Sequence, residues 1–422
     1  MRRGGTRRAA SSVHGARLAA CTMASPVASR AARRTAALCT VARGCVARCQ
    51  RRAAPRAAAE DGASTRPLLY AVSGAPGHDR EGHPECAARV PAIEGALARA
   101  GLTDAAALLA DWADATPEQI ALVHDSQYLP ALERRCGAME SGAAAVDLEG
   151  GGPTYAAAAT HAAALRAAGA GVALVDACAD AHALGERPPV GFSVCRPPGH
   201  HAVPKGPMGF CVLSNIAVAA RHAQRRGYKR VLVYDFDVHH GNGTQDAFYS
   251  DPDVLFVSTH QRGSYPGTGA ANEVGEGAGE GANINLPLPG GAGAMAARLA
   301  FDAIVAPAAQ RFKPDIILVS AGYDAHWRDK LAGLQFTTSA YHALGEGIRE
   351  LADELCGGRL VFFLEGGYDL DALGASVADT WRGVLGVPSE DPFRATQEMY
   401  LYDEPDERVA DAIAKAKATH AL

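Results

Sequence analysis

Short apolar runs alternate with longer, Ala- and Leu-rich segments along most of the chain. The runs predict β-strands at 66–73, 190–195, 230–235, 254–259, 315–320 and 359–367. The segments between them predict helices at 152–179, 211–227, 296–312 and 337–358. Continuous apolar runs are typical of strands that are buried on both faces, so the alternation predicts an α/β fold with a mostly parallel sheet between two layers of helices.

Ionisable side chains stand beside glycine at the carboxyl ends of four of these strands. "RPPGHH" follows Cys195, "DFDVHHGN" follows Tyr234, "AGYDAH" follows Ser320, and "EGGYD" follows the strand residues 359–364. In open parallel sheets, ligands bind beyond the carboxyl ends of the strands. Four such ends on one side of a sheet therefore predict a single active site.

The stretch Asp237-Val238-His239 has the spacing of a metal site. Residues two apart on an extended segment point the same way, so one carboxylate and one imidazole can bind the same ion. Asp324 in "GYDAH" is the candidate third ligand. Two Asp and one His leave a coordination position open for water and substrate, as in catalytic zinc sites. The alternative interpretation is a capped turn with a buried, hydrogen-bonded histidine.

The remaining polar side chains at the strand ends suit acid–base chemistry on a carbonyl group. His200 and His201 can supply a base and an acid. Asp235 and Asn242 can orient these two imidazoles by hydrogen bonds. Tyr368, in a loop flanked by glycine, can donate to a developing oxyanion.

Composition separates the first 59 residues from the rest of the chain. Residues 1–59 contain no Asp or Glu and hold 13 of the 41 basic residues, all of them Arg. This Arg-rich, Ala-rich and acid-free segment is typical of a disordered organellar transit peptide. A chloroplast location is favoured over a mitochondrial one, and a cytosolic or nuclear pool is a further alternative. A basic tail that binds nucleic acid is the competing interpretation.

The chain from residue 60 onward is strongly acidic. It has 41 − 13 = 28 basic residues against 46 acidic ones, a formal charge of about 28 − 46 = −18. We therefore expect no direct nucleic-acid binding through a basic surface. We also expect no membrane span, because no continuous apolar run approaches the ~18 residues that one needs. Its six cysteines form no CxxC pair. Any metal is then expected to use His and carboxylate ligands.

Five sequence blocks resemble those of zinc-dependent histone deacetylases. They are "RPPGHHAVPKGPMGFC", "DFDVHHGNGTQDAF", "STHQRGSYPGTG", "AGYDAHWRDKLAGLQFT" and "FLEGGYDL". The third block and Asn242 resemble the class II branch. With the N-terminal segment and residues 400–422, the chain is most similar to the organellar class II histone deacetylases of plants and algae.

This resemblance implies the arginase–deacetylase α/β fold, with one central, mostly parallel sheet of about eight strands and helices on both faces. It also implies a catalytic domain over residues 60–395. Residues 396–422 would form a helical tail that packs on this domain or trails from it.

The resemblance implies two kinds of bound cation. Asp237, His239 and Asp324 match the ligands of one zinc ion per chain. Asp235 and Ser258, together with Asp237 and His239, match a site for a structural monovalent cation, expected to be K⁺, which is bound mostly through backbone oxygens.

It also implies the catalytic roles of the polar residues. His200 and His201 match a tandem pair in which His201 is the general base and His200 is paired with Asp235. Asn242 stands where class I members have an aspartate beside His201, so the basicity of His201 is expected to differ from theirs. Tyr368 matches the tyrosine that stabilises the transition state.

The substrate tunnel is implied in the same way. Phe210 and Tyr265 match its aromatic walls, and the carbonyl of Gly209 matches the acceptor of the substrate N–H. Leu331 lies at the tunnel mouth, where the polyamine-deacetylating branch carries Glu, and this argues against a polyamine specialist. Lys330 departs from the Pro that is common at its position.

These matches predict a zinc-dependent deacetylase that hydrolyses N-acetyl-lysine side chains of proteins, such as histones, tubulin or organellar proteins, to lysine and acetate. One alternative is a deacetylase of small acetylated arylalkylamines or polyamines on the same fold. An inactive acyl-lysine binder is a second. A binuclear manganese hydrolase is a third, although it would want a carboxylate where Gly241 stands.

Three further polar positions have structural interpretations. His124 is expected to be structural. His83-Pro84-Glu85, with Arg89 after it, is expected to anchor a loop. His260, after a strand, is expected to be a hydrogen-bonded residue behind the site.

Overall fold

The computed structural model of the protein describes residues 68–422, apart from 141, 143 and 149–151. The predicted transit peptide at 1–59 lies outside the described residues, as do the first two residues of the strand predicted at 66–73.

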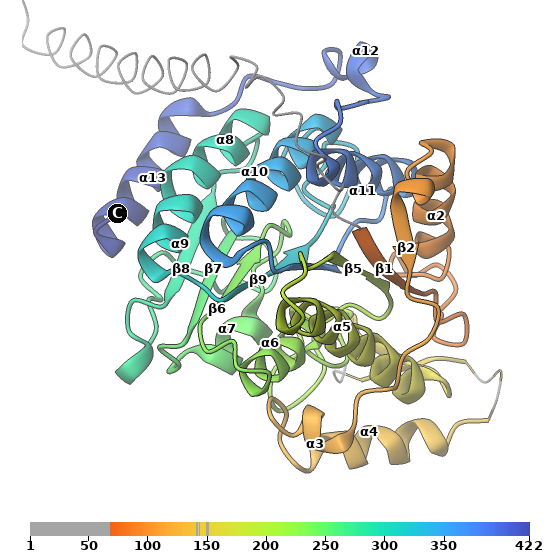
Figure 1. Cartoon of the computed structure of the whole chain (residues 1–422). Helices are drawn as coiled ribbons and strands as arrows, with labels where there is room; N and C mark the ends of the chain where they lie inside the picture. The colour runs from red at the N-terminus through yellow and green to blue at the C-terminus, as the bar shows by residue number, and fades with distance from the viewer. Residues whose placement is uncertain (1–67, 141, 143, 149–151) are drawn as a thin grey trace, which may run out of the picture. The chain divides into compact units, whose positions relative to one another are not determined.

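An eight-stranded β-sheet forms the centre of the described chain (Figure 1), and its strand order is β2-β1-β5-β10-β9-β6-β7-β8. Every neighbouring pair in this order is parallel. The predicted parallel sheet of about eight strands is therefore confirmed. The strands are β1 (Leu68–Ser73), β2 (Ala106–Leu108), β5 (Val190–Cys195), β6 (Val231–Asp235), β7 (Val254–Gln261), β8 (Asn283–Leu288), β9 (Ile316–Ala321) and β10 (Leu360–Leu364).

Helices cover both faces of this sheet (Figure 1). The helices on one face are α5 (Thr160–Ala183), α6 (Asn215–Arg225) and α7 (Asn242–Phe248). Those on the other face are α2 (Arg89–Arg99), α8 (Ala294–Ala300), α9 (Ala306–Phe312), α10 (Thr338–Cys356), α11 (Leu370–Leu385) and α13 (Asp406–His420). The smaller elements are α3 (Pro117–Ile120), α4 (Tyr128–Gly137), α12 (Arg394–Gln397) and the antiparallel pair β3 (Val146–Asp147) and β4 (Tyr155–Ala156).

The two helical layers explain why the strands are continuously apolar. In β6, Val231 and Val233 pack in the cluster with α5 and α6, whereas Leu232 and Tyr234 pack in the cluster with α10 and α11. Successive side chains of a strand point to opposite faces, so both faces need apolar residues when both are covered.

Several predicted boundaries were wrong. The helix predicted at 152–179 begins only at Thr160, because residues 155–156 pair as strand β4. The helix predicted at 211–227 begins at Asn215. Strands β2 and β8, at the two edges of the sheet, were not among the six strands predicted from apolar runs.

Helix α5 is the one helix of the described chain that is long and apolar enough to cross a membrane, and 67% of its most apolar 18-residue stretch is buried inside the fold. The helix packs against α6 and against β1 and β5. Its apolar side chains therefore serve the core of the domain.

The C-terminal segment returns to the body of the fold. Helix α13 contacts β8 and α8, and its Val409, Ile413 and Ala416 belong to a hydrophobic core cluster. Ahead of this helix, the Glu404 carboxylate accepts N–H groups at the start of α8, from Gly293, Met295 and Ala296, at 2.9–3.0 Å.

Candidate active site

Four strands that are neighbours in the sheet deliver the predicted site residues. In the order β5, β10, β9 and β6, the loops after their carboxyl ends carry the tandem histidines, the tyrosine, one aspartate and the D-x-H pair. The predicted convergence of strand ends is thus present in the fold. Polar side chains placed at the carboxyl ends of parallel strands are in the usual position for a ligand site.

Asp237, His239 and Asp324 form a compact group whose ligand atoms lie within 4.8 Å of one another. His239 Nδ1 is 3.3 Å from Asp237 Oδ1 and 3.1 Å from Asp324 Oδ2. Burial alone would lower the pKa of His239, but Asp324 and Asp237 outweigh it and raise this pKa to about 11. The two carboxylates therefore favour a positive charge at the point where the three side chains meet.

Backbone glycines bring the chain close to these carboxylates. The N–H of Gly366 donates to Asp237 Oδ2 at 2.8 Å. A Cβ atom at Gly366 would overlap carboxylate oxygens of both Asp237 and Asp324, and one at Gly322 would overlap Asp237. Two carboxylate ligands and one imidazole ligand match the number and kind of protein ligands found in catalytic zinc sites.

A second group lies beside this one, formed by His200, Cys211 and Glu365. Its ligand atoms already have partners. One Glu365 oxygen accepts N–H groups of Gly199 at 2.7 Å and His200 at 3.0 Å. Cys211 Sγ accepts the N–H of His201 at 3.4 Å. We interpret this group as the support of the tandem histidines.

The two tandem histidines have different partners and opposite pKa shifts. His200 Nδ1 lies 3.1 Å from Asp235 Oδ2. Burial lowers the pKa of His200, but Asp237 and Asp235 outweigh it and raise it to about 10. His201 Nδ1 lies 2.8 Å from Asn242 Oδ1.

Burial, together with the neighbouring His200 and His239, holds the pKa of His201 well below its usual value. His201 is therefore the neutral imidazole of the pair, and it can accept a proton. This difference between two adjacent histidines is the arrangement expected of an acid–base site.

Gly241 makes the contact between His200 and Asp235 sterically feasible. A Cβ atom at this position would overlap Asp235 Oδ2 and come within 3.3 Å of His200 Nδ1. Gly241, where a binuclear site would need a carboxylate ligand, therefore has no side chain to supply one.

Tyr368 lies at the edge of the same site. Its ring is perpendicular to that of Phe210, with 5.7 Å between centroids. Burial, and then the Asp324 carboxylate, raise the pKa of Tyr368 well above its ordinary value. Its hydroxyl therefore keeps its proton and can act as a hydrogen-bond donor.

A buried ionic network holds the loop that carries this tyrosine. Arg89 donates from Nε to the carbonyl of Gly367 at 2.7 Å and from Nη2 to that of Glu365 at 2.5 Å. Glu85 in turn accepts from Arg89 at 3.2 Å and from Arg196 Nη2 at 2.8 Å. The loop-anchoring role expected for the "HPE" stretch and Arg89 agrees with these contacts.

The predicted tunnel residues surround the histidines and the tyrosine. Gly209 and Phe210 both have left-handed backbone, with φ of 54° and 71°. A Cβ at Gly209 would lie 2.7 Å from His201 Cγ and 2.8 Å from Tyr265 Cε1, so the backbone passes directly between the two rings. The ring of Tyr265 is perpendicular to that of His201 at 5.1 Å between centroids. Leu331 lies further out and is 42% exposed.

The residues expected around a monovalent cation are also close together. Asp235 and Ser258 are direct partners across the β6–β7 pair, and both are fully buried. Asp235 Oδ1 accepts the N–H of Asp237 at 3.1 Å. Behind Ser258, His260 lies 2.9 Å from its hydroxyl and 3.0 Å from the carbonyl of Gly269, as expected for a hydrogen-bonded residue behind the site.

Other histidines of the motifs lie outside the metal group. His240, the second histidine of "DVHHGN", is near Thr268 Oγ1 at 2.8 Å and Gln245 Oε1 at 3.1 Å. His124 accepts the N–H of Ser214 at 2.9 Å and is buried, which fits its expected structural role.

Sequence reasoning assigned no role to Glu365 or Asp329, although both support the site. Glu365 could have been found, because it directly follows an apolar strand in "EGGYD". Asp329 gave no such signal, since its contacts with the Tyr368 loop are with backbone groups 39 and 40 residues away in the sequence.

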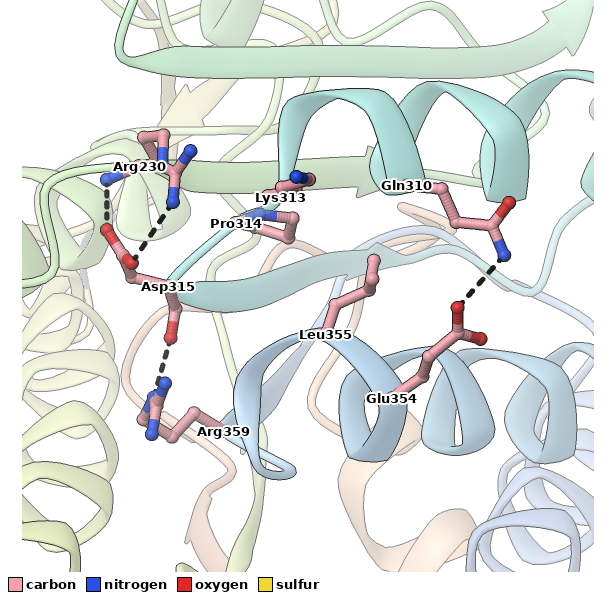
Figure 2. A pocket seen from close by; sticks show the side chains of 8 residues that line it. All are labelled: Arg230, Gln310, Lys313, Pro314, Asp315, Glu354, Leu355 and Arg359. Carbon is pink, nitrogen blue, oxygen red and sulfur yellow. Dashed lines mark hydrogen bonds and ion pairs between the residues drawn. The ribbon is translucent and has the colours of Figure 1, made fainter.

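A surface pocket of about 650 Å³ lies away from this chemistry (Figure 2). Arg230, Asp315 and Arg359 line it, and they immediately precede β6, β9 and β10, so the pocket is at the amino ends of these strands. The Asp315 carboxylate accepts the backbone N–H of Arg230 at 2.7 Å and lies 3.9 Å from the Arg230 guanidinium, and the backbone carbonyl of Asp315 accepts from Arg359 Nε at 2.6 Å. We assign the pocket no catalytic role.

The fold and the site define a hydrolase of the metal-dependent class. Residues 83–384 match the family described as "Histone deacetylase domain". The chain is 56% identical to "Histone deacetylase 14, chloroplastic" of Arabidopsis thaliana over 364 residues, which are 84% of this chain and 85% of the relative. It is also 56% identical to "Histone deacetylase 10, chloroplastic" of Oryza sativa subsp. japonica, over 84% of this chain and 81% of the relative. The crystal structure of the HDA15 HD domain superposes with a TM-score of 0.72 and 32% identity, over 84% of this chain and 95% of that one.

The chain belongs to the histone deacetylase family. The resemblance predicted from the five sequence blocks is confirmed, and so is the expectation of a hydrolase that acts on acetylated amides. The family is zinc-dependent in general, and the structure contains a group that fits this metal. The names of both plant relatives confirm the expected chloroplast location.

Proposed function

We propose that this protein is a zinc-dependent lysine deacetylase that hydrolyses N-acetyl-lysine side chains of proteins to lysine and acetate. The observation that carries the proposal is the convergence of three potential metal ligands with a neutral histidine and a protonated tyrosine at one edge of the sheet. The strongly negative charge of the chain from residue 60 onward suits substrates in which the modified lysine lies in a cationic segment.

Asp237, His239 and Asp324 would hold one zinc ion per chain. Zinc bound there would polarise the substrate carbonyl and lower the pKa of a water molecule toward neutrality. Asp235 and Ser258, with backbone oxygens of the D-x-H stretch, would bind a monovalent cation such as K⁺ behind the site.

His201 is the proposed general base. Its Nδ1 faces Asn242 Oδ1, so the proton of the neutral ring is on Nδ1 and the free nitrogen is Nε2. Nε2 takes a proton from the attacking water and returns it to the amine that leaves. His200, held by Asp235, keeps its own proton and adds positive charge beside the developing oxyanion.

Tyr368 is the proposed oxyanion donor, and the tunnel presents the substrate to it. Its hydroxyl donates to the carbonyl oxygen as the carbon becomes tetrahedral, when the charge on that oxygen is largest. Phe210 and Tyr265 would line the acyl-lysine chain on two sides. The carbonyl of Gly209 would accept the amide N–H of the substrate and so fix the direction of the scissile bond.

One observation favours a second candidate function. Leu331 and Tyr265, at the mouth of the proposed tunnel, are 42% and 37% exposed. An apolar rim of this kind suits the ring of a small acetylated arylalkylamine as well as a peptide, whereas a polyamine would meet no carboxylate at Leu331.

An activity comparison separates the two candidates. The full-length chain, loaded with zinc, is assayed for acetate release from acetyl-lysine peptides and from acetylated arylalkylamines. Asp237→Ala serves as the blank, and Asp371→Ala, an exposed carboxylate on α11, is the matched control. We expect peptide turnover that survives in the control and disappears in the blank. Turnover of small amines alone would overturn the protein-substrate proposal, and binding without acetate release would indicate an inactive binder.

A further inference from the structure

The Asp329 side chain joins two loops at the tunnel mouth. It is only 7% exposed. Its Oδ2 accepts the N–H of Tyr368 at 2.7 Å and the N–H of Asp369 at 3.1 Å, and its Oδ1 accepts the N–H of Leu331 at 3.1 Å. One carboxylate thus binds the backbone of the proposed oxyanion donor and the backbone of the rim residue.

The preceding residue strengthens the same connection. Arg328 Nε donates to Asp369 Oδ1 at 3.4 Å, and the same Asp369 oxygen accepts the N–H of Ala372 at 2.9 Å, where it caps helix α11. Tyr368 immediately precedes this cap. The backbone of Tyr368 is therefore held in place by Asp329, which accepts its N–H group, and by the capped start of helix α11, which follows it.

We propose that Asp329 is a positioning residue for deacetylation, which holds the Tyr368 hydroxyl in its working position and couples the tunnel mouth at Leu331 to it. This inference rests on the proposed function. A substrate that presses on the rim at Leu331 acts on the same carboxylate that fixes the backbone of Tyr368, so seating of the substrate and alignment of the oxyanion donor are linked.

The chemistry of the contact explains why a carboxylate is needed. An ionised carboxyl group accepts hydrogen bonds on both oxygens, and here they serve three N–H groups. An asparagine has one accepting oxygen and would turn its NH₂ group toward N–H donors. At least one of these N–H groups would lose its partner, and the loop that carries Tyr368 would shift to find another.

The test compares Asp329→Asn with Asp411→Asn, which makes the same chemical change on an exposed carboxylate of helix α13. We expect kcat of Asp329→Asn on an acetyl-lysine peptide to fall about 10- to 100-fold, because a misplacement of about 1 Å can cost ~10² in rate. We expect the KM and the zinc content to stay close to those of the Asp411→Asn control.

The decisive readout is the double variant Asp329→Asn with Tyr368→Phe. If Asp329 acts through the tyrosine, the double variant is no slower than Tyr368→Phe alone, because the group being positioned is already gone. Additive losses, or a wild-type kcat in Asp329→Asn, would overturn the inference.

If the Asp329→Asn variant fails to fold or to retain zinc, the Asp329→Glu variant takes its place. This variant keeps the charge and both oxygens but displaces them by one methylene group, and the same loss of kcat and the same non-additivity are expected of it. If the wild-type chain itself releases no acetate from the peptide, the proposed function fails, and this outcome is distinct from wild-type activity that Asp329 does not affect.

Discussion

At the residue scale, removal of the Tyr368 hydroxyl tests one contribution alone, the hydrogen bond that it donates to the oxyanion. We predict that Tyr368→Phe lowers kcat by about 10² to 10³, the usual cost of losing one oxyanion donor. The phenylalanine keeps the ring that packs on Phe210. Zinc content, measured by elemental analysis, is therefore expected to stay at the wild-type value. Turnover at the wild-type rate would show that the hydroxyl has no part in the reaction.

Asn242 controls the pH at which His201 can act as a base. The pKa of His201 lies well below 6.5, so the acidic limb of the kcat/KM profile is expected below that pH. In Asn242→Asp a carboxylate would face Nδ1, favour the imidazolium ion and raise this pKa. We predict that the limb moves to higher pH in a full pH–rate profile. A limb that stays in place or moves to lower pH would rule out His201 as the base.

The metal group was the easiest part of the site to predict, and its supports were the hardest. Asp237 and His239 are two residues apart just after an apolar strand, and an extended segment would place both side chains on one side of the chain. In the structure they lie in a bend after β6, where the N–H of His239 donates to Asp237 Oδ1 at 2.8 Å. Asp329 binds the Tyr368 loop through backbone N–H groups of residues 39 and 40 positions away. Backbone N–H and carbonyl groups leave no trace in a sequence pattern, so such contacts appear only when the fold is known.

At the scale of elements, Glu404 connects the C-terminal segment to helix α8. Its carboxylate accepts three N–H groups at the start of α8 and neutralises the positive end of that helix. We predict that Glu404→Ala destabilises the protein by about 1–2 kcal/mol, the usual cost of losing a helix cap. Urea denaturation measures this, with the exposed Glu398→Ala as control. Equal midpoints for the two variants would contradict the capping role.

The central strands were predictable from apolar runs because helices bury both of their faces. The edge strands were not predictable from apolar runs. Strand β2 is three residues long and is partly exposed, and "NINLPL" of β8 mixes Asn and Pro with apolar residues. The Ala-rich stretch before α5 was predicted as helix, but there tertiary pairing of β4 with β3 overrides the local preference for helix.

At the scale of the whole molecule, buried histidines make the fold sensitive to acid. Burial lowers the pKa values of His78, His124 and His240 to about 4 and those of His260 and His326 to about 3. Below pH 6.5 the unfolded chain binds protons that the folded chain does not, so stability falls as the pH falls toward 4. We predict a lower urea midpoint at pH 5 than at pH 7.

A single substitution checks the origin of this slope. His124→Gln keeps an oxygen that can accept the N–H of Ser214 but removes one titrating group, so the loss of stability between pH 7 and pH 5 is expected to shrink. The raised pKa values of His200 and His239 act in the opposite direction in the metal-free chain, where their stabilisation is complete below pH 6.5 and is lost as the pH rises toward 10. A pH dependence that is unchanged in His124→Gln would show that this histidine does not contribute.

The most direct test of the account is a zinc titration of the metal-free, full-length chain, with acetate release from an acetyl-lysine peptide as the readout. Three ligands in one compact group predict that activity rises in proportion to added zinc and stops rising at one equivalent per chain. They also predict that Asp324→Ala shows no rise at one equivalent. Activity in the metal-free chain, or a rise that continues to two equivalents, would contradict a mononuclear zinc deacetylase.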